Sequence, residues 1–280
     1  MVKSSEADLT SVAEHYEFGK NWADFAARLS ESSIAEAEKG MVKLLHADEL
    51  VGRTFLDIGC GSGLHSLAAL RLGVRSVMAT DIDPDSVETT RTVLSRYAGS
   101  SNWSVRVQSV FDLRPDQTYD VVYSWGVLHH TGDMHRAIRS AAALVAPAGL
   151  MCLALYRKTP LCGLWKVEKR VYTSGPEWLR WVFEKIFLGA VHLRFWMSGR
   201  NYKSFNDDYV RNRGMSYETD MRDWLGGYPY ESISEAATLK LFEELGFDSV
   251  RRFCVPPGPG VFGSGCDEYV FRRRSKDIQH

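Results

Sequence analysis

The sequence predicts an α/β protein whose parallel sheet is covered by helices on both faces. Short apolar segments alternate with amphipathic ones over residues 51–156, a glycine-rich turn follows the first of them, and 45% of the 280 residues are hydrophobic. Buried parallel strands read as apolar runs, and helices must connect them. We expect an N-terminal helical extension (1–50), a core (51–156), a helical insertion after the fifth strand (157–231) and a final segment (232–280) that completes the core.

The first strand and the turn after it are the most informative stretch. An apolar strand over 54–58 contains Asp57, and a helix begins near Leu64. Between them lie three alternate glycines, Gly59, Gly61 and Gly63. Glycines allow close backbone approach to a ligand, and the helix start offers free N–H groups. Neither the dinucleotide fingerprint nor a phosphate-binding P-loop fits, because Leu64 replaces the third glycine and no Lys follows. An acid here suits a cationic amino group, although a tight turn without ligand needs the same glycines.

The second and third strands are also followed by acids. The strand over 76–81 ends at Asp81, a position from which acids in nucleotide-binding α/β folds accept ribose hydroxyls. Asp83 is expected to cap the helix that Pro84 begins. Phe111 and Asp112 follow the third strand, over 103–107. Asp112 is either a ligand-binding acid or a loop acid in an ordinary turn.

The fourth strand, over 119–124, leads into two adjacent histidines. Ser124 ends the strand, and Trp125, His129 and His130 follow within six residues. Histidine is the side chain best suited to proton transfer near neutral pH, so either ring is a candidate general base. The alternative is that a histidine only braces this loop.

In combination these motifs resemble those of the class I S-adenosylmethionine-dependent methyltransferases. The resemblance covers 51–156 and 234–273, and it implies a seven-stranded Rossmann-like sheet and S-adenosyl-L-methionine as the cofactor. Phe111 or Val110 would pack on the adenine ring. Tyr16 and Trp22 would close over the cofactor, or else pack on the domain edge. The implied cofactor-binding residues are Asp57, Gly59, Gly61, Gly63, Asp81, Ile82, Phe111, Asp112, Ser124, Tyr16 and Trp22.

The segment 157–231 has no strand–helix rhythm and is aromatic and basic. Between Arg157 and Arg213 there are twelve Lys or Arg and five Asp or Glu, an excess of seven positive charges. A helix is expected to begin after Pro176 and to be apolar around most of its circumference, so protein, a greasy ligand or an anionic membrane surface must cover it. We expect this insertion to form an acceptor-binding cap. The expected acceptor-facing residues are Trp125, Asp223, Tyr228, Tyr230 and Glu231.

The resemblance implies methyl transfer by in-line displacement, and it is nearest to small-molecule O-methyltransferases of quinone biosynthesis and natural-product pathways. We therefore expect O-methylation of a hydrophobic or anionic metabolite, with His129 and His130 as catalytic candidates. No Asn-Pro-Pro-Tyr or Asp-Pro-Pro-Tyr follows the fourth strand, which argues against methylation of nucleic-acid bases. Transfer to nitrogen or sulfur, transfer to RNA or protein through the basic insertion, and a non-catalytic cofactor-binding module remain open.

The amino-acid composition narrows the classes of protein to which this chain can belong. The net charge of −1 gives no global field that favours nucleic acid. The five cysteines lack the spacing of metal ligands, so no metal site is expected. No run of 18 apolar residues and no signal peptide are apparent, so a cytoplasmic location is expected. The sequence does not indicate the oligomeric state.

Overall fold

The computed structural model describes residues 22, 26, 29–99, 102–213, 217–256, 258–261 and 263–275. Within these ranges one mixed sheet has the strand order β3-β2-β1-β4-β5-β7-β6, which confirms the seven-stranded sheet expected from the sequence. All strands except β7 run parallel, and β7 lies antiparallel between β5 and β6. The strands are β1 (Thr54–Ile58), β2 (Ser76–Asp81), β3 (Trp103–Val107), β4 (Tyr119–Trp125), β5 (Val145–Tyr156), β6 (Phe247–Phe253) and β7 (Cys266–Arg273).

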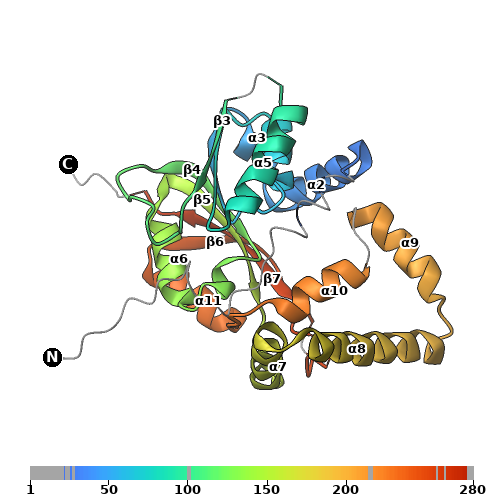
Figure 1. Ribbon diagram of the computed structural model, residues 1–280. Coiled ribbons are helices and arrows are strands. Elements are labelled where there is room, and N and C mark those ends of the chain that lie inside the picture. Colours follow the sequence, from blue (N-terminus) through green and yellow to red (C-terminus); the bar gives the residue numbers. More distant parts are fainter. Residues whose placement is uncertain are drawn as a thin grey trace, which may run out of the picture.

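Helices cover both faces of the sheet, as Figure 1 shows. On one face α2 (Glu31–Leu44), α4 (Leu64–Arg71) and α5 (Pro84–Tyr97) pack on side chains such as Phe55 and Val121. On the other face α6 (Met134–Ala143) and α11 (Glu235–Glu244) pack on side chains such as Leu56 and Val122. Successive strand residues point to opposite faces, so the central strands β1 and β4 supply both cores and are buried along nearly their whole length.

Polar caps fix where several helices begin. The Asp83 carboxylate accepts a hydrogen bond from Asp85 N at 3.0 Å, and Pro84 occupies the first turn of α5. The Ser234 hydroxyl accepts one from Ala237 N at 3.3 Å at the start of α11. Each cap satisfies an N–H group that has no partner inside its helix. The expected cap at Asp83 is therefore confirmed, and it fixes the chain direction just after Asp81.

The start of β5 contains an irregularity. A Pro-Ala-Gly run such as 147–149 is typical of a turn, but β5 runs from Val145 to Tyr156 and includes these residues. The pairing with β4 shifts between Tyr119 and Val121, and Ala148 has a φ of 60°. The extra residues form an irregularity within the strand, because pairing resumes on both sides of them.

The described residues of the insertion form four helices beyond the carboxyl ends of β4 and β5. They are α7 (Cys162–Ser174), α8 (Glu177–Met197), α9 (Tyr202–Arg213) and α10 (Tyr217–Gly226), while α3 (Ala47–Leu50) precedes the sheet. Buried Tyr172, Met221 and Leu225 join α7 and α10, and Phe183 and Phe187 of α8 pack against them. Beyond this contact α8 extends away from the sheet (Figure 1). No helix in the described ranges combines the length and apolarity needed to cross a bilayer.

Candidate active site

The turn after β1 is closely packed against the chain that follows β4. Gly59 donates its N–H to Thr80 O at 2.7 Å, and its φ is 76°. A Cβ on Gly59 would lie 2.4 Å from the Val127 side chain, so only glycine fits. Val127 directly precedes the 3₁₀ turn η1 (Leu128–His130), which carries both histidines. The glycine turn and the histidines are thus adjacent parts of one edge of the sheet.

Asp81 ties the glycine turn to the end of β2. Its Oδ2 accepts a hydrogen bond from Gly61 N at 3.0 Å, and its Oδ1 accepts one from Asp83 N at 3.0 Å. A Cβ on Gly61 would lie 3.2 Å from the indole of Trp22. The structure therefore brings Asp81, Gly61 and Trp22 together, and it leaves the Asp81 carboxylate with remaining acceptor capacity beside the glycine turn.

Asp57 places a second carboxyl group below this turn. Its side chain is 2% exposed, and it accepts a hydrogen bond from Ser66 Oγ at 2.6 Å. Burial raises the pKa of Asp57 to about 7 despite the Ser66 bond, and repulsion from Asp81 adds to the rise. Burial also raises the pKa of Asp81. These two acids destabilise each other's ionised forms and lie beside a turn that only glycine can form. The arrangement fits a cationic ligand with hydroxyl groups, such as S-adenosylmethionine.

Asp57 should couple cofactor affinity and folding stability to pH in opposite directions. Between pH 3.8 and about 7 the folded chain keeps a proton that the unfolded chain has lost, so stability from this group is full below that window and falls as pH rises through it. A cationic ligand favours the ionised form, so affinity should rise through the same window. Asp57→Asn should therefore gain on the order of 2 kcal/mol of unfolding free energy at pH 8 and bind S-adenosylmethionine more weakly.

Denaturant titration and calorimetry at pH 5 and pH 8 measure both quantities. Asp120→Asn is the matched control, because hydrogen bonds from Thr54 outweigh burial and lower the pKa of Asp120. That variant should lose stability at pH 8 and keep its cofactor affinity. If Asp57→Asn is destabilised at pH 8 or binds cofactor as the unsubstituted protein does, the role assigned to Asp57 is wrong.

The remaining expected cofactor residues take varied positions. Ile82 is half-buried, and Asp112 is exposed in the loop after β3. The half-buried ring of Phe111 lies 4.5 Å from the Arg136 guanidinium, whereas Val110 belongs to the core. Ser124 is fully buried, and its hydroxyl donates to Ile58 O at 3.1 Å. Tyr16 lies outside the described residues.

The two histidines of η1 have different surroundings. His129 is fully buried, neither ring nitrogen has a hydrogen-bond partner among the described residues, and burial lowers its pKa well below 6.5. Its ring packs 4.0 Å from that of Tyr156. His130 is half-buried, and its Nδ1 lies 2.7 Å from Pro229 O. A carbonyl oxygen can only accept, so Nδ1 carries the proton and Nε2 of neutral His130 is an acceptor.

An aromatic cluster continues from the histidines into the insertion. Tyr156 lies 5.2 Å from Tyr230, and the Lys169 ammonium lies 5.5 Å from Tyr230 and 3.8 Å from Trp224, measured to ring centroids. Lys169 is fully buried, donates to Trp224 O, and has a pKa that burial lowers to about 7. We call the residues His129, His130, Tyr156, Lys169, Trp224 and Tyr230 the aromatic cluster.

The residues expected to face the acceptor do not all belong to this cluster. Tyr230 does, and its hydroxyl lies 3.1 Å from Ser264 Oγ. The Glu231 carboxylate accepts from Met134 N at 2.8 Å, at the start of α6. The Trp125 indole donates to Glu268 at 3.0 Å on the α4 side of the sheet. Asp223 and Tyr228 are half-buried near the end of α10.

Sequence reasoning missed Lys169 and its neighbour Glu168. Both Glu168 oxygens are buried without a partner among the described residues, and burial raises the pKa of this carboxyl group. One signal was available, because Cys162, Lys169 and Tyr172 fall on one stripe of α7 and each is buried. A lysine in the middle of an otherwise apolar stripe indicates a buried functional or paired charge.

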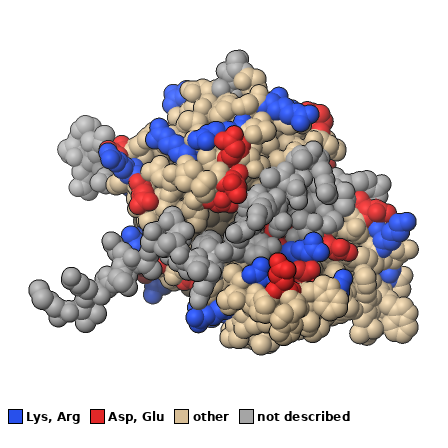
Figure 2. Space-filling model, viewed as in Figure 1, with Lys and Arg blue, Asp and Glu red and all other residues tan. Residues whose placement is uncertain are grey.

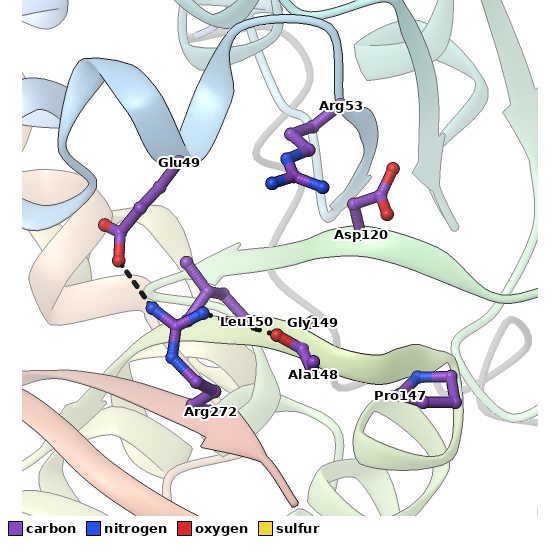
Figure 3. A pocket seen from close by; sticks show the side chains of 8 residues that line it. All are labelled: Glu49, Arg53, Asp120, Pro147, Ala148, Gly149, Leu150 and Arg272. Atoms are coloured by element: carbon purple, nitrogen blue, oxygen red, sulfur yellow. Dashed lines mark hydrogen bonds and ion pairs between the residues drawn. The ribbon is translucent and has the colours of Figure 1, made fainter. Parts of the chain in front are cut away.

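A surface hollow of about 170 Å³ lies at the opposite edge of the sheet (Figure 3). It is lined at the amino ends of the parallel strands by Arg53 and Asp120, with Arg272 between Glu49 and Ala148. Arg272 is 2.8 Å from Glu49, and Asp120 accepts from Thr54 N at 2.8 Å. Arg272 and Glu49 thus pair with each other and Asp120 binds Thr54, and ligands of open α/β sheets bind at the carboxyl edge.

Comparisons with known proteins agree with this geometry. A family model described as a methyltransferase domain matches residues 13–209. The ubiquinone biosynthesis O-methyltransferase of Xanthomonas oryzae pv. oryzae (strain PXO99A) is 39% identical over 114 residues, 40% of this chain and 46% of that protein. The chain thus spans about half the length of the curated relatives it matches.

Two solved structures share the fold. Magnesium protoporphyrin IX methyltransferase from Synechocystis PCC 6803 with bound SAH has a TM-score of 0.51 at 18% identity, covering 86% of this chain and 81% of that one. Burkholderia thailandensis 1,6-didemethyltoxoflavin-N1-methyltransferase has a TM-score of 0.50 at 16% identity, covering 85% and 79%. Since the family model covers well over half of the chain, the protein belongs to the methyltransferase-domain family, and its sheet has the class I strand order.

Proposed function

We propose that the enzyme methylates an oxygen atom of a small aromatic or enolic acceptor that binds beside the aromatic cluster. The observation that carries this proposal is the contact between His130 Nδ1 and Pro229 O at 2.7 Å. It fixes the tautomer in which Nε2 can accept a proton from a hydroxyl group. A hydroxyl acceptor needs such a base more than an amine or thiol does, because the pKa of a hydroxyl group lies far above neutral pH.

The aromatic composition of the cluster supports a planar acceptor. Rings of Tyr156, Tyr230 and Trp224 line one region, and flat apolar surfaces favour stacking with an aromatic ligand. Lys169 contributes a buried cation when protonated, and this cation would stabilise an anionic group of the acceptor. The name of the matching curated relatives, ubiquinone biosynthesis O-methyltransferase, agrees with oxygen as the atom that accepts the methyl group.

The chain's residues would act in three ways. Asp57, Asp81 and the glycine turn would hold S-adenosylmethionine, which would supply a methyl group already activated on a sulfonium. Val127 links this turn to η1, so the cofactor and the acceptor are held in neighbouring positions, which is the main requirement of in-line displacement. His130 Nε2 would take the hydroxyl proton as the acceptor oxygen bonds to the methyl group and the S–CH3 bond breaks, with the sulfur leaving as a neutral thioether. His129 packs behind His130, with the ring centroids 4.4 Å apart.

A macromolecular acceptor is the second candidate, and the seven excess positive charges between Arg157 and Arg213 favour it. Transfer of labelled methyl groups into a fractionated cell extract separates the two. We expect label in the small-molecule fraction, lost when His130 is changed to Gln. Label confined to RNA, with binding that weakens steeply as salt rises, would instead establish nucleic acid as the acceptor. Label confined to protein would equally exclude a small acceptor.

A further inference from the structure

Helix α8 has an outer face that no described part of the chain covers. Six of its large apolar side chains are more than half exposed: Trp178, Trp181, Ile186, Leu193, Trp196 and Met197. The three tryptophans are 67%, 59% and 78% exposed. Figure 2 shows the region where α8 lies as a broad, mostly uncharged surface at the lower right. Soluble proteins rarely expose a contiguous apolar surface of this kind without a use for it.

The opposite face of α8 packs against other helices of the same chain. Val191 is 4% exposed, and Phe183, Phe187 and Leu188 pack on the cluster formed by α7 and α10. Packing within the chain therefore explains the inner face and leaves the outer one unexplained. A helix of 21 residues is about 30 Å long, so the outer face is an extended strip. We call it the α8 outer face and define it by the six exposed side chains above.

The surroundings of the α8 outer face are cationic. Over residues 161–203, all of which are described, Glu177 is the one exposed acid. The exposed bases in the same stretch are Lys166, Arg170, Lys185, Arg194, Arg200 and Lys203. Lys185 lies within the face, with its ammonium 5.8 Å from the Trp181 ring. Tryptophans that alternate with long basic side chains are typical of helices that lie in a lipid headgroup region.

We propose that the α8 outer face docks on an anionic lipid bilayer, with the helix parallel to the surface. The tryptophans and Leu193 enter the headgroup boundary, and Lys185 extends its ammonium toward lipid phosphates. A second copy of the chain fits this face less well, because a two-fold contact would place one cationic rim against another. The helix is not apolar enough to span the bilayer, although its 21 residues would be long enough.

This inference does not depend on the identity of the acceptor, but it bears on how an acceptor arrives. Phe187 of the inner face lies 5.5 Å from Trp224, which belongs to the aromatic cluster. The α8 outer face and the aromatic cluster are therefore two sides of one helical layer. An apolar acceptor dissolved in the bilayer would have a short path to the site.

Sedimentation of the full chain with sucrose-loaded vesicles tests the proposal. We expect pelleting with vesicles of equal parts phosphatidylglycerol and phosphatidylcholine, weaker pelleting with phosphatidylcholine alone, and a loss of binding as salt rises. The triple variant Trp178→Ser, Trp181→Ser, Trp196→Ser should bind at least tenfold more weakly, and Lys185→Glu should lose binding to the anionic vesicles. The control Val51→Ser, Val107→Ser removes two exposed side chains elsewhere and should bind normally.

Quenching by brominated lipids provides a measurement that needs no variant. Tryptophan fluorescence of the unsubstituted protein should fall when brominated acyl chains replace ordinary ones, and thermal unfolding checks that each variant is folded. The proposal is overturned if the protein fails to pellet, if the triple variant binds as tightly as the control, or if bromine causes no quenching. It is also overturned if sedimentation velocity shows a dimer that the triple variant abolishes.

Discussion

Asp81→Asn should lower the affinity for S-adenosylmethionine by at least a hundredfold. The Asp81 oxygens hold the N–H groups of Gly61 and Asp83, so the carboxylate shapes the turn in addition to accepting ligand hydroxyls. Asparagine has one acceptor oxygen, and its amide would face one of these donors. A hydrogen bond to a charged group is worth about 1.5–3 kcal/mol. Loss of the bonds to two ligand hydroxyls is therefore consistent with the expected fall in affinity.

Calorimetry with S-adenosylmethionine measures this change directly. Asp85→Asn is the matched control, because Asp85 is an exposed acid two residues after Asp83. Its N–H donates to the Asp83 carboxylate and not to the glycine turn. Its affinity should stay within twofold of the unsubstituted protein. Unchanged affinity in a folded Asp81→Asn variant would refute the cofactor site as assigned.

His130→Gln should lower kcat about a hundredfold at pH 7 and leave cofactor affinity unchanged. A positioned general base contributes roughly 10²–10⁴ in rate, and glutamine keeps the bulk and a donor for Pro229 O but cannot take up a proton. The deficit should shrink as pH rises, because an acceptor hydroxyl that ionises in solution no longer needs the base. A pH–rate profile at saturating cofactor measures this recovery.

His135→Gln serves as the control, since His135 is an exposed histidine on α6 and should retain full activity. A His130→Gln deficit that is equal at every pH would indicate that the ring only positions the acceptor. Full activity of His130→Gln would remove it from the mechanism. His129→Gln is a weaker test, because a buried ring packed on Tyr156 also contributes to folding.

Local signals in the sequence were sufficient to predict the elements that form the core of the fold. The glycine turn, Asp81 and the cap at Asp83 each depend on residues close together in the chain, and the structure places the corresponding elements where they were expected. The seven-stranded sheet was implied by the resemblance to the methyltransferase family, and the observed strand order confirms it. The irregularity near Ala148 was missed, because a Pro-Ala-Gly segment reads as a turn and only pairing with β4 shows that the strand continues through it.

The acceptor side of the candidate site was harder to predict because distant segments build it. Lys169 reaches Trp224 and Tyr230 across 55 or more residues, and no spacing rule brings them together. Glu231 reads as an acid near the acceptor, yet its carboxylate caps α6. The side of α8 that stays uncovered was also undetermined, because the helix is apolar almost all round and only packing distinguishes its faces.

The central claim is that a hydroxyl oxygen of a small acceptor receives the methyl group beside the aromatic cluster. Incubation of the enzyme with S-adenosylmethionine carrying a ¹³C-labelled methyl group and a metabolite extract tests it most directly. The carbon chemical shift of the purified product distinguishes a methyl group on oxygen from one on nitrogen or sulfur. We predict a single methoxy signal on an aromatic or enolic product, absent with His130→Gln at pH 7. A methyl signal on nitrogen or sulfur, or a methoxy signal of equal strength with His130→Gln, would contradict it.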